Sequence, residues 1–126
     1  MNYMPDVESM DRLSGGPLGP AHHVVIAGNV KSAGKIEYLY LLVVYEAATE
    51  KPVYIVASEA NAMRDALGGG SHFLGVFDGN GHANLGDSDD WGDVDRFADK
   101  ALALAAAHLG LRPVDDDDEP PRAAIT

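Results

Sequence analysis

The chain has 126 residues, no cysteine and a formal net charge of −11 at pH 7. Without cysteine it can form no disulfide, thiolate zinc site, iron–sulfur cluster or cysteine nucleophile. Its negative field repels phosphates, so we expect no nucleic-acid partner, and its content of 46% hydrophobic residues is typical of a globular domain.

Residues 1–20 are rich in proline and glycine and show neither helical nor alternating periodicity, so we predict a disordered arm. They also lack the basic start and apolar run of a secretory signal. The longest apolar stretch, residues 38–45, is far shorter than the about 20 residues that a membrane-spanning helix needs. We therefore expect a soluble, cytoplasmic protein that does not bind membranes.

Three strands are predicted after this arm. Residues 22–30 are rich in β-branched side chains, residues 36–46 form the strongest strand pattern in the chain, and residues 52–57 continue it. The turns between them are short. Because parallel neighbours need a crossover of about a dozen residues or more, this spacing predicts an antiparallel meander.

A short helix is predicted next, with Ser58 as its N-cap and Gly68 as its stop. The side chains expected on its inner face are Ala60, Met63, Ala66 and Leu67. A fourth strand over residues 73–78 follows, and a glycine-rich turn at residues 78–81 leads to a short fifth strand over residues 82–85.

The last helix has the clearest signals. Asp90 is expected as its N-cap, Asp93 as its third helical residue and Gly110 as its end, and its apolar residues recur at the spacing of one helical face. The predicted fold is therefore α+β, with an antiparallel sheet of 4–5 strands in the order β-β-β-α-β-(β)-α packed against a C-terminal helix. It forms a single domain over residues 21–112, and residues 113–126 are predicted to be a disordered acidic tail.

The second predicted strand is apolar on both sides, so the sheet has two apolar faces, and one helix can cover only one of them. The short helix, the fifth strand and the arm could cover the second face within the monomer, or that face could be an interface, or a ligand cavity could lie between sheet and helix. Tyrosine is enriched at interfaces. We therefore identify Tyr38, Tyr40 and Tyr54 as candidate interface residues for self-association or for a protein partner.

Histidine and aspartate side chains cluster in sequence around the fourth strand. The candidate ligand or metal residues are His72, Asp78, His82 and Asp87, although their spacing matches no established metal motif. Adjacent Ser71 and His72 are expected to point apart, so serine hydrolysis is not predicted.

Three functions remain open from these residues. The first is a non-catalytic binding or protein-interaction domain that self-associates through one sheet face and needs no cofactor. The second is a metal-dependent or acid/base enzyme that uses the loops after the fourth strand. The third is an acidic mimic or inhibitor of a basic partner, for which the acidic run at residues 115–119 is the sequence signal.

Overall fold

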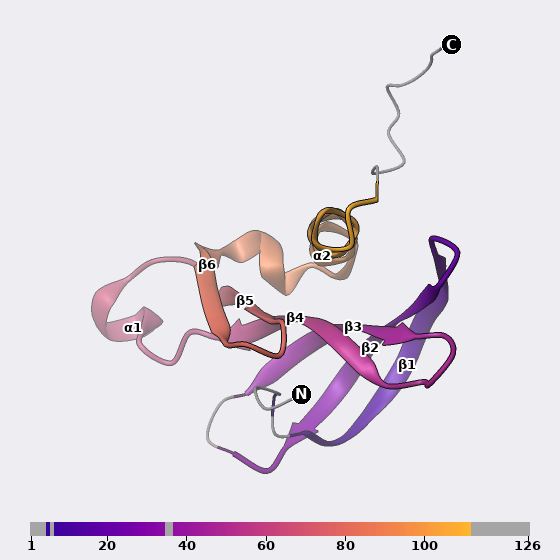
Figure 1. Cartoon of the computed structure of the whole chain (residues 1–126). Helices are drawn as coiled ribbons and strands as arrows, with labels where there is room; N and C mark the ends of the chain where they lie inside the picture. Colours follow the sequence, from indigo (N-terminus) through magenta and orange to yellow (C-terminus); the bar gives the residue numbers. More distant parts are fainter. Residues whose placement is uncertain (1–4, 6, 35–36, 112–126) are drawn as a thin grey trace.

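The computed structural model of the chain describes residue 5, residues 7–34 and residues 37–111. Within them a single antiparallel sheet of six strands is formed in chain order, so that each strand pairs with the next, and one long helix lies across one face (Figure 1). None of the helices in these ranges has the length and apolar character to cross a membrane. The elements are β1 (Val7–Leu18), β2 (His22–Ser32), β3 (Tyr38–Glu46), β4 (Pro52–Ala60), α1 (Arg64–Leu67), β5 (His72–Phe77), β6 (His82–Ser88), the 3-10 helix η1 (Asp89–Gly92) and α2 (Val94–His108).

The predicted α+β class, the antiparallel sheet and the C-terminal helix are confirmed, but the sheet has six strands rather than four or five. The additional strand is β1, which lies in the region predicted as a disordered arm and pairs with β2 from Val7 opposite Ser32 to Leu18 opposite His22. Three register shifts interrupt β1, and most of its side chains are exposed. This removes the alternation that identifies a strand, and an edge strand tolerates proline and glycine. The predicted acidic tail lies outside the described residues.

The short helix was predicted to begin after Ser58, but in the structure helix α1 begins at Arg64. Ser58 and Glu59 lie in β4, opposite Leu74 and Phe73 of β5, and both are buried. Helix α1 has only four residues. The side chains of Met63 and Leu67, predicted to lie on a buried inner face, are instead 54% and 77% exposed. The strand continues because pairing with β5 satisfies its backbone, whereas a helix this short gains little from its own hydrogen bonds.

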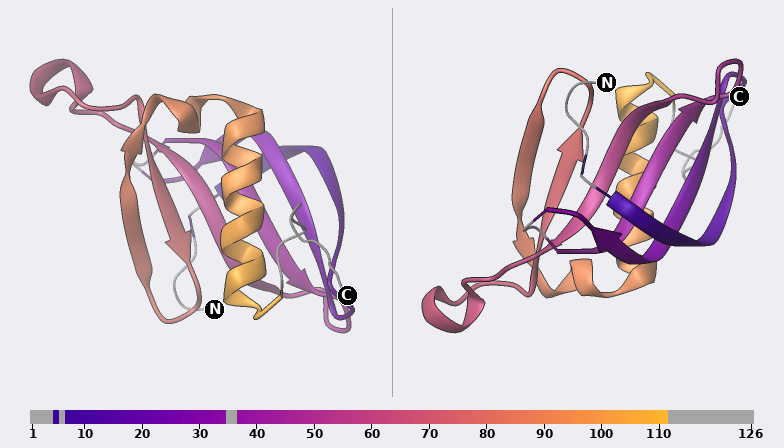
Figure 2. Two further views of the ribbon diagram at one scale, coloured as in Figure 1. Left: turned by 90° about the horizontal axis from the view of Figure 1, so that it is seen from above. Right: turned by 90° about the horizontal axis from the view of Figure 1, so that it is seen from below.

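Helix α2 covers the face formed by alternate residues of β2 to β5 (Figure 2). Phe97, Ala101 and Ala105 are fully buried against this face, and the two alanines allow the helix to lie close to the sheet. The N-cap is Asp93, whose carboxylate accepts a hydrogen bond from the backbone N–H of Arg96 at 3.0 Å, rather than the predicted Asp90. The sheet side chains that belong to the same buried cluster as these helix residues are Val24, Ile26, Leu42, Val44, Tyr54, Val56 and Leu74.

The second face is covered by the first two strands themselves. β2 pairs with β3 only from His22 to Ala27, and beyond Asn29, whose φ is 48°, the β1–β2 ribbon crosses this face (Figure 2, right). Asn29 Nδ2 donates to Asp11 Oδ2 at 2.8 Å at the bend. The ribbon places Val7, Met10 and Val30 against a second buried cluster, which contains Tyr38, Leu41, Val43, Ile55, Ala57 and Phe77.

Candidate interaction surface

The three tyrosines predicted to share an interface are divided between the two faces. Tyr54 and Tyr40 lie on the helix side, where Tyr40 contacts Phe97, whereas Tyr38 belongs to the cluster on the second face. A register shift between Tyr38 and Tyr40 in β3 causes this division. Tyr38 and Tyr54 are also buried, at 8% and 5% exposure, so the prediction of one exposed tyrosine face is corrected.

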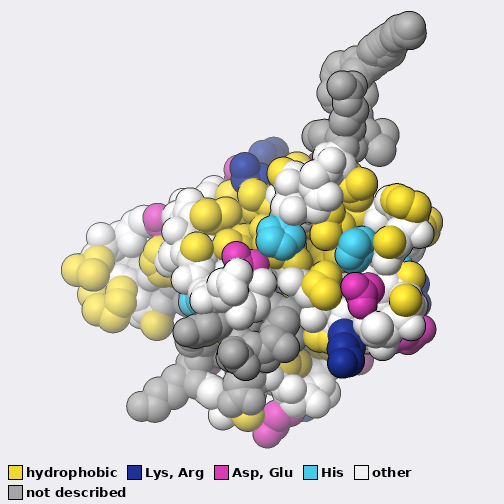
Figure 3. Space-filling model, in the orientation of Figure 1, with side chains coloured by type: hydrophobic (Ala, Val, Ile, Leu, Met, Phe, Trp, Pro, Cys, Tyr) yellow, Lys and Arg dark blue, Asp and Glu magenta, His cyan; other side chains and the backbone are white. Residues whose placement is uncertain are grey.

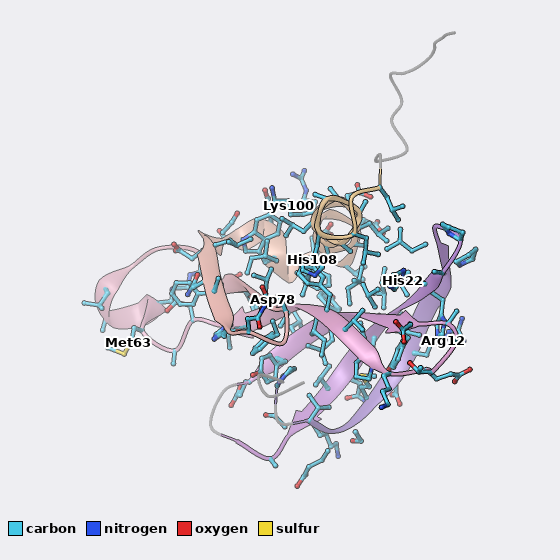
Figure 4. The ribbon with its side chains drawn as sticks, in the orientation of Figure 1. Arg12, His22, Met63, Asp78, Lys100 and His108 are labelled. Atoms are coloured by element: carbon cyan, nitrogen blue, oxygen red, sulfur yellow. The ribbon has the colours of Figure 1, made fainter. Side chains whose placement is uncertain are left out.

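Tyr54 stabilises the C-terminal end of α2. Its ring stacks on that of His108 with centroids 4.2 Å apart, and Asp78 lies on the same side of the molecule (Figure 4). Burial, and to a smaller degree the negative charge of Asp78, raises the pKa of Tyr54. The phenol is therefore neutral at physiological pH, which fits a packing role.

The four predicted ligand residues each make a separate local contact. Asp78 accepts hydrogen bonds from the backbone N–H groups of its own turn, Asp87 accepts one from Gly70, and His72 contacts Ser71. His82 instead contacts Glu59. No group of three or more histidine, aspartate or glutamate side chains suited to a metal ion occurs in the described part of the chain. A shared metal site of these four residues is therefore not formed by this arrangement.

Ser71 and His72 do not point apart as expected. Ser71 Oγ lies 2.8 Å from His72 Nδ1, and burial together with the charge of Arg64 lowers the pKa of His72, although Asp89 opposes this effect. Asp89, however, accepts from the Ser71 backbone N–H at 2.8 Å and pairs with Arg64 at 3.5 Å. The carboxylate thus holds the backbone and α1, and the arrangement differs from a catalytic triad, in which the acid orients the imidazole.

Glu59 and His82 form the most buried ionisable contact among the described side chains. Glu59 Oε2 lies 3.0 Å from His82 Nε2, and the imidazole stacks on Phe77 with centroids 4.3 Å apart. Burial raises the pKa of Glu59, while the charge and hydrogen bond of His82 oppose this rise. The pair joins β4 to the edge strand β6 across Gly75 of β5, where a Cβ atom would collide with the Glu59 carboxylate.

A different surface forms where α1, β6 and η1 meet. It has three of the four large hydrophobic side chains that are exposed within the described ranges, and all its aspartates are exposed. We call this surface the acidic end, and define it by Met63, Leu67, Leu85, Asp87, Asp89 and Asp90. Helix α1 projects from the sheet there with its hydrophobic atoms at the surface, and Met63 lies at the extremity (Figures 3 and 4).

Several contacts fix the acidic end to the sheet. Arg64 pairs with Asp89 at 3.5 Å, the Asp87 carboxylate accepts from the Gly70 backbone N–H, and Asn61 Nδ2 donates to the Gly70 carbonyl at 2.9 Å. Between Arg64 and Arg96 the sequence contains no lysine or arginine. These contacts attach the acidic end to the sheet, and its three aspartates outnumber the two arginines that pair with them, so it keeps a negative charge.

Sequence reasoning identified Asp87 but missed the rest of the acidic end. Met63 and Leu67 were assigned to a buried helix face because apolar residues at a spacing of four are usually inside. Glu59 was also missed as a site residue. Its signal was available, because it continues the alternate positions of Ile55 and Ala57 on one side of β4.

Comparison with known proteins finds no match for this chain among family models, curated proteins or solved structures.

Proposed function

We propose that the protein is a non-catalytic interaction domain whose acidic end binds a basic protein partner. The observation that carries this proposal is that exposed apolar side chains and aspartates with only weak surface ion pairs occur together at one end of the molecule. Protein interfaces obtain much of their affinity from a few apolar anchors and much of their specificity from complementary charge around them.

The apolar part of the surface supplies the anchors. Leu67 and Met63 are 77% and 54% exposed on α1, and Leu85 is 50% exposed on β6. Scattered single leucines on a surface need no explanation, but three large exposed side chains at one end of the molecule can fill recesses of a partner. Each would gain roughly 1 to 3 kcal/mol if fully buried in a complex.

The charges define the kind of partner. Asp87, Asp89 and Asp90 are exposed, and within the described part of the chain only Asp89 and Asp90 pair with an arginine, each at 3.5 Å. These ion pairs are solvent-exposed and weak, so the carboxylates stay available to a stronger cation. A partner rich in lysine or arginine would be attracted by these acids and by the net charge of the whole chain.

The edge position of β6 supplies backbone groups as well. β6 is the last strand in the sheet, with β5 as its one neighbour, and six of its seven residues are exposed. An edge strand can add an extended segment of a partner through main-chain hydrogen bonds. The proposed partner segment is therefore basic and extended.

The test uses a peptide of alternating lysine and valine as the probe, and the same peptide with glutamate in place of lysine as its control. Anisotropy of the labelled peptide should report binding of the lysine peptide alone. Asp89→Asn with Asp90→Asn should weaken binding about tenfold. Asp99→Asn with Glu50→Gln removes the same number of exposed charges elsewhere and should change binding about twofold at most.

The apolar contribution has its own control. Leu67→Ser should weaken binding of the lysine peptide, whereas Leu13→Ser, which alters the exposed leucine outside the acidic end, should not. Equal losses of affinity in the two charge variants would show attraction by net charge alone. Equal losses in the two leucine variants would show that Leu67 has no special role. Either result would contradict the proposal.

Self-association through a sheet face stays a prediction and is measured by sedimentation of the unmodified protein. The β1–β2 ribbon covers the face in question, which removes the main reason to expect it. A cytoplasmic location likewise stays a prediction.

A further inference from the structure

A pocket of about 300 Å³ lies between the bent end of the β1–β2 ribbon and the second face of the sheet. It is remote in the fold from the acidic end, because its walls come from β1, β3 and the start of β4. The residues that line it are Pro5, Val7, Glu8, Ser9, Met10, Leu41, Val43, Tyr45, Pro52 and Ile55.

The floor of the pocket is apolar and rigid. Leu41, Val43 and Ile55 lie on the central strands β3 and β4 and are each at most 3% exposed. Val43 and Ile55 are direct cross-strand partners, so backbone pairing fixes their spacing. A floor of this kind keeps its shape when the pocket is filled.

The roof is shaped by irregularities in β1. Register shifts occur between Val7 and Ser9 and between Ser9 and Asp11, within the part of the strand that lines the pocket. Bulges bend a strand and redirect its side chains. The hydrogen bond from Asn29 to Asp11 joins the two strands of the ribbon at its bend.

The lining specifies the chemistry of an occupant. Among the lining residues that the structure describes, Glu8 carries the only charge, and Ser9 and Tyr45 add hydroxyl groups, while the others are apolar. A negative occupant would meet Glu8 and the net charge of −11. The volume is at the lower end of the range of small-molecule pockets, which runs from about 300 to 1,000 Å³.

We propose that this pocket is a binding site for an uncharged apolar small molecule, of the size of two to three aromatic rings or a medium-length aliphatic chain. Such a ligand packs on Val43 and Ile55 and is enclosed by Met10 of the ribbon. The site is independent of the proposed partner surface and either can exist without the other.

The test uses N-phenylnaphthylamine, an uncharged dye whose emission increases in apolar surroundings, with its sulfonated analogue as a matched anionic control. The unmodified full chain should bind the uncharged dye about tenfold more tightly than the sulfonate. Methyl resonances of Val43 and Ile55 should shift during the titration. No binding, equal affinity for the two dyes, or shifts confined to other methyl groups would overturn the proposal.

Two tryptophan variants on one strand complete the test. Ser9 and Ser14 are both exposed on β1, and only Ser9 lines the pocket. Ser9→Trp fills the space from the roof without altering the buried floor and should abolish dye binding, whereas Ser14→Trp should leave it unchanged. Equal binding by both folded variants would contradict the site. Dye affinity that falls as protein concentration rises would show that a second copy occupies the pocket instead, and would also overturn the proposal.

Discussion

Glu59 and His82 meet at 3.0 Å although 23 residues separate them in the chain, and their contact links the buried strand β4 to the exposed edge strand β6. The carboxylate belongs to a side chain that is almost fully buried, whereas about a third of the imidazole side chain is exposed. A buried carboxylate becomes more unfavourable when its partner is removed. Both stability and the attachment of β6 should therefore respond to changes in this pair.

Glu59→Gln should raise the stability of the protein near neutral pH. Because the folded state raises the pKa of Glu59, the stabilisation linked to its protonation is complete below the pKa of the unfolded chain and is lost as pH rises through the folded value. The free energy of unfolding of the variant should exceed that of the unmodified protein near neutral pH, and the two values should be nearly equal at about pH 4. Urea unfolding at both pH values measures this, with the exposed Glu37→Gln as control. A less stable Glu59→Gln protein near neutral pH would contradict the prediction.

Gly75→Ala should separate Glu59 from His82. The new Cβ atom would collide with the Glu59 carboxylate and lie 2.8 Å from His82 Nε2. One buried hydrogen bond would be lost and the side chains would have to move, which costs about 1 to 3 kcal/mol. Thermal unfolding and amide exchange in β6 measure the effect. Gly16→Ala, on a strand with no atom near the added Cβ, is the matched control and should have a smaller effect.

Ala101→Leu should destabilise the contact between α2 and the sheet. Ala101 is fully buried in the helix-side cluster, so three additional carbon atoms would force the helix away at a cost of about 1 to 3 kcal/mol. Ala103→Leu makes the same substitution at an exposed position of the same helix and should leave stability nearly unchanged. Equal unfolding midpoints for both variants would show that α2 does not pack through its alanines.

Asp93→Ala should destabilise the start of α2 by about 1 kcal/mol, because the carboxylate caps the Arg96 N–H. Asp90→Ala should have a smaller effect, since Asp90 precedes the helix in η1 and its side chain contacts Arg96 at 3.5 Å on the surface. Chemical denaturation of both variants compares the two caps. A larger loss for Asp90→Ala would restore the assignment that the sequence alone suggested.

The candidate sites show where local reasoning ends. The apolar periodicity of the last helix correctly predicted one buried face, which holds Phe97, Ala101 and Ala105 in the structure, because helix burial repeats with the helical period. The same rule failed for Met63 and Leu67, since periodicity indicates a possible apolar face but not whether anything packs against it. The Glu59–His82 contact was beyond local reasoning, because it depends on the register of three strands and on the space above Gly75.

The sequence by itself determined the α+β class, the short connections that make the sheet antiparallel, and the need to bury both sides of the central strands, because these follow from side-chain periodicity and loop length. Only the tertiary structure decided how the second face is covered. The bend at Asn29 and the bulges of β1 bring the β1–β2 ribbon over that face, and no local pattern in residues 7–18 encodes this, because strand pairing is a contact with a distant part of the chain. The apolar pocket is a product of that long-range arrangement.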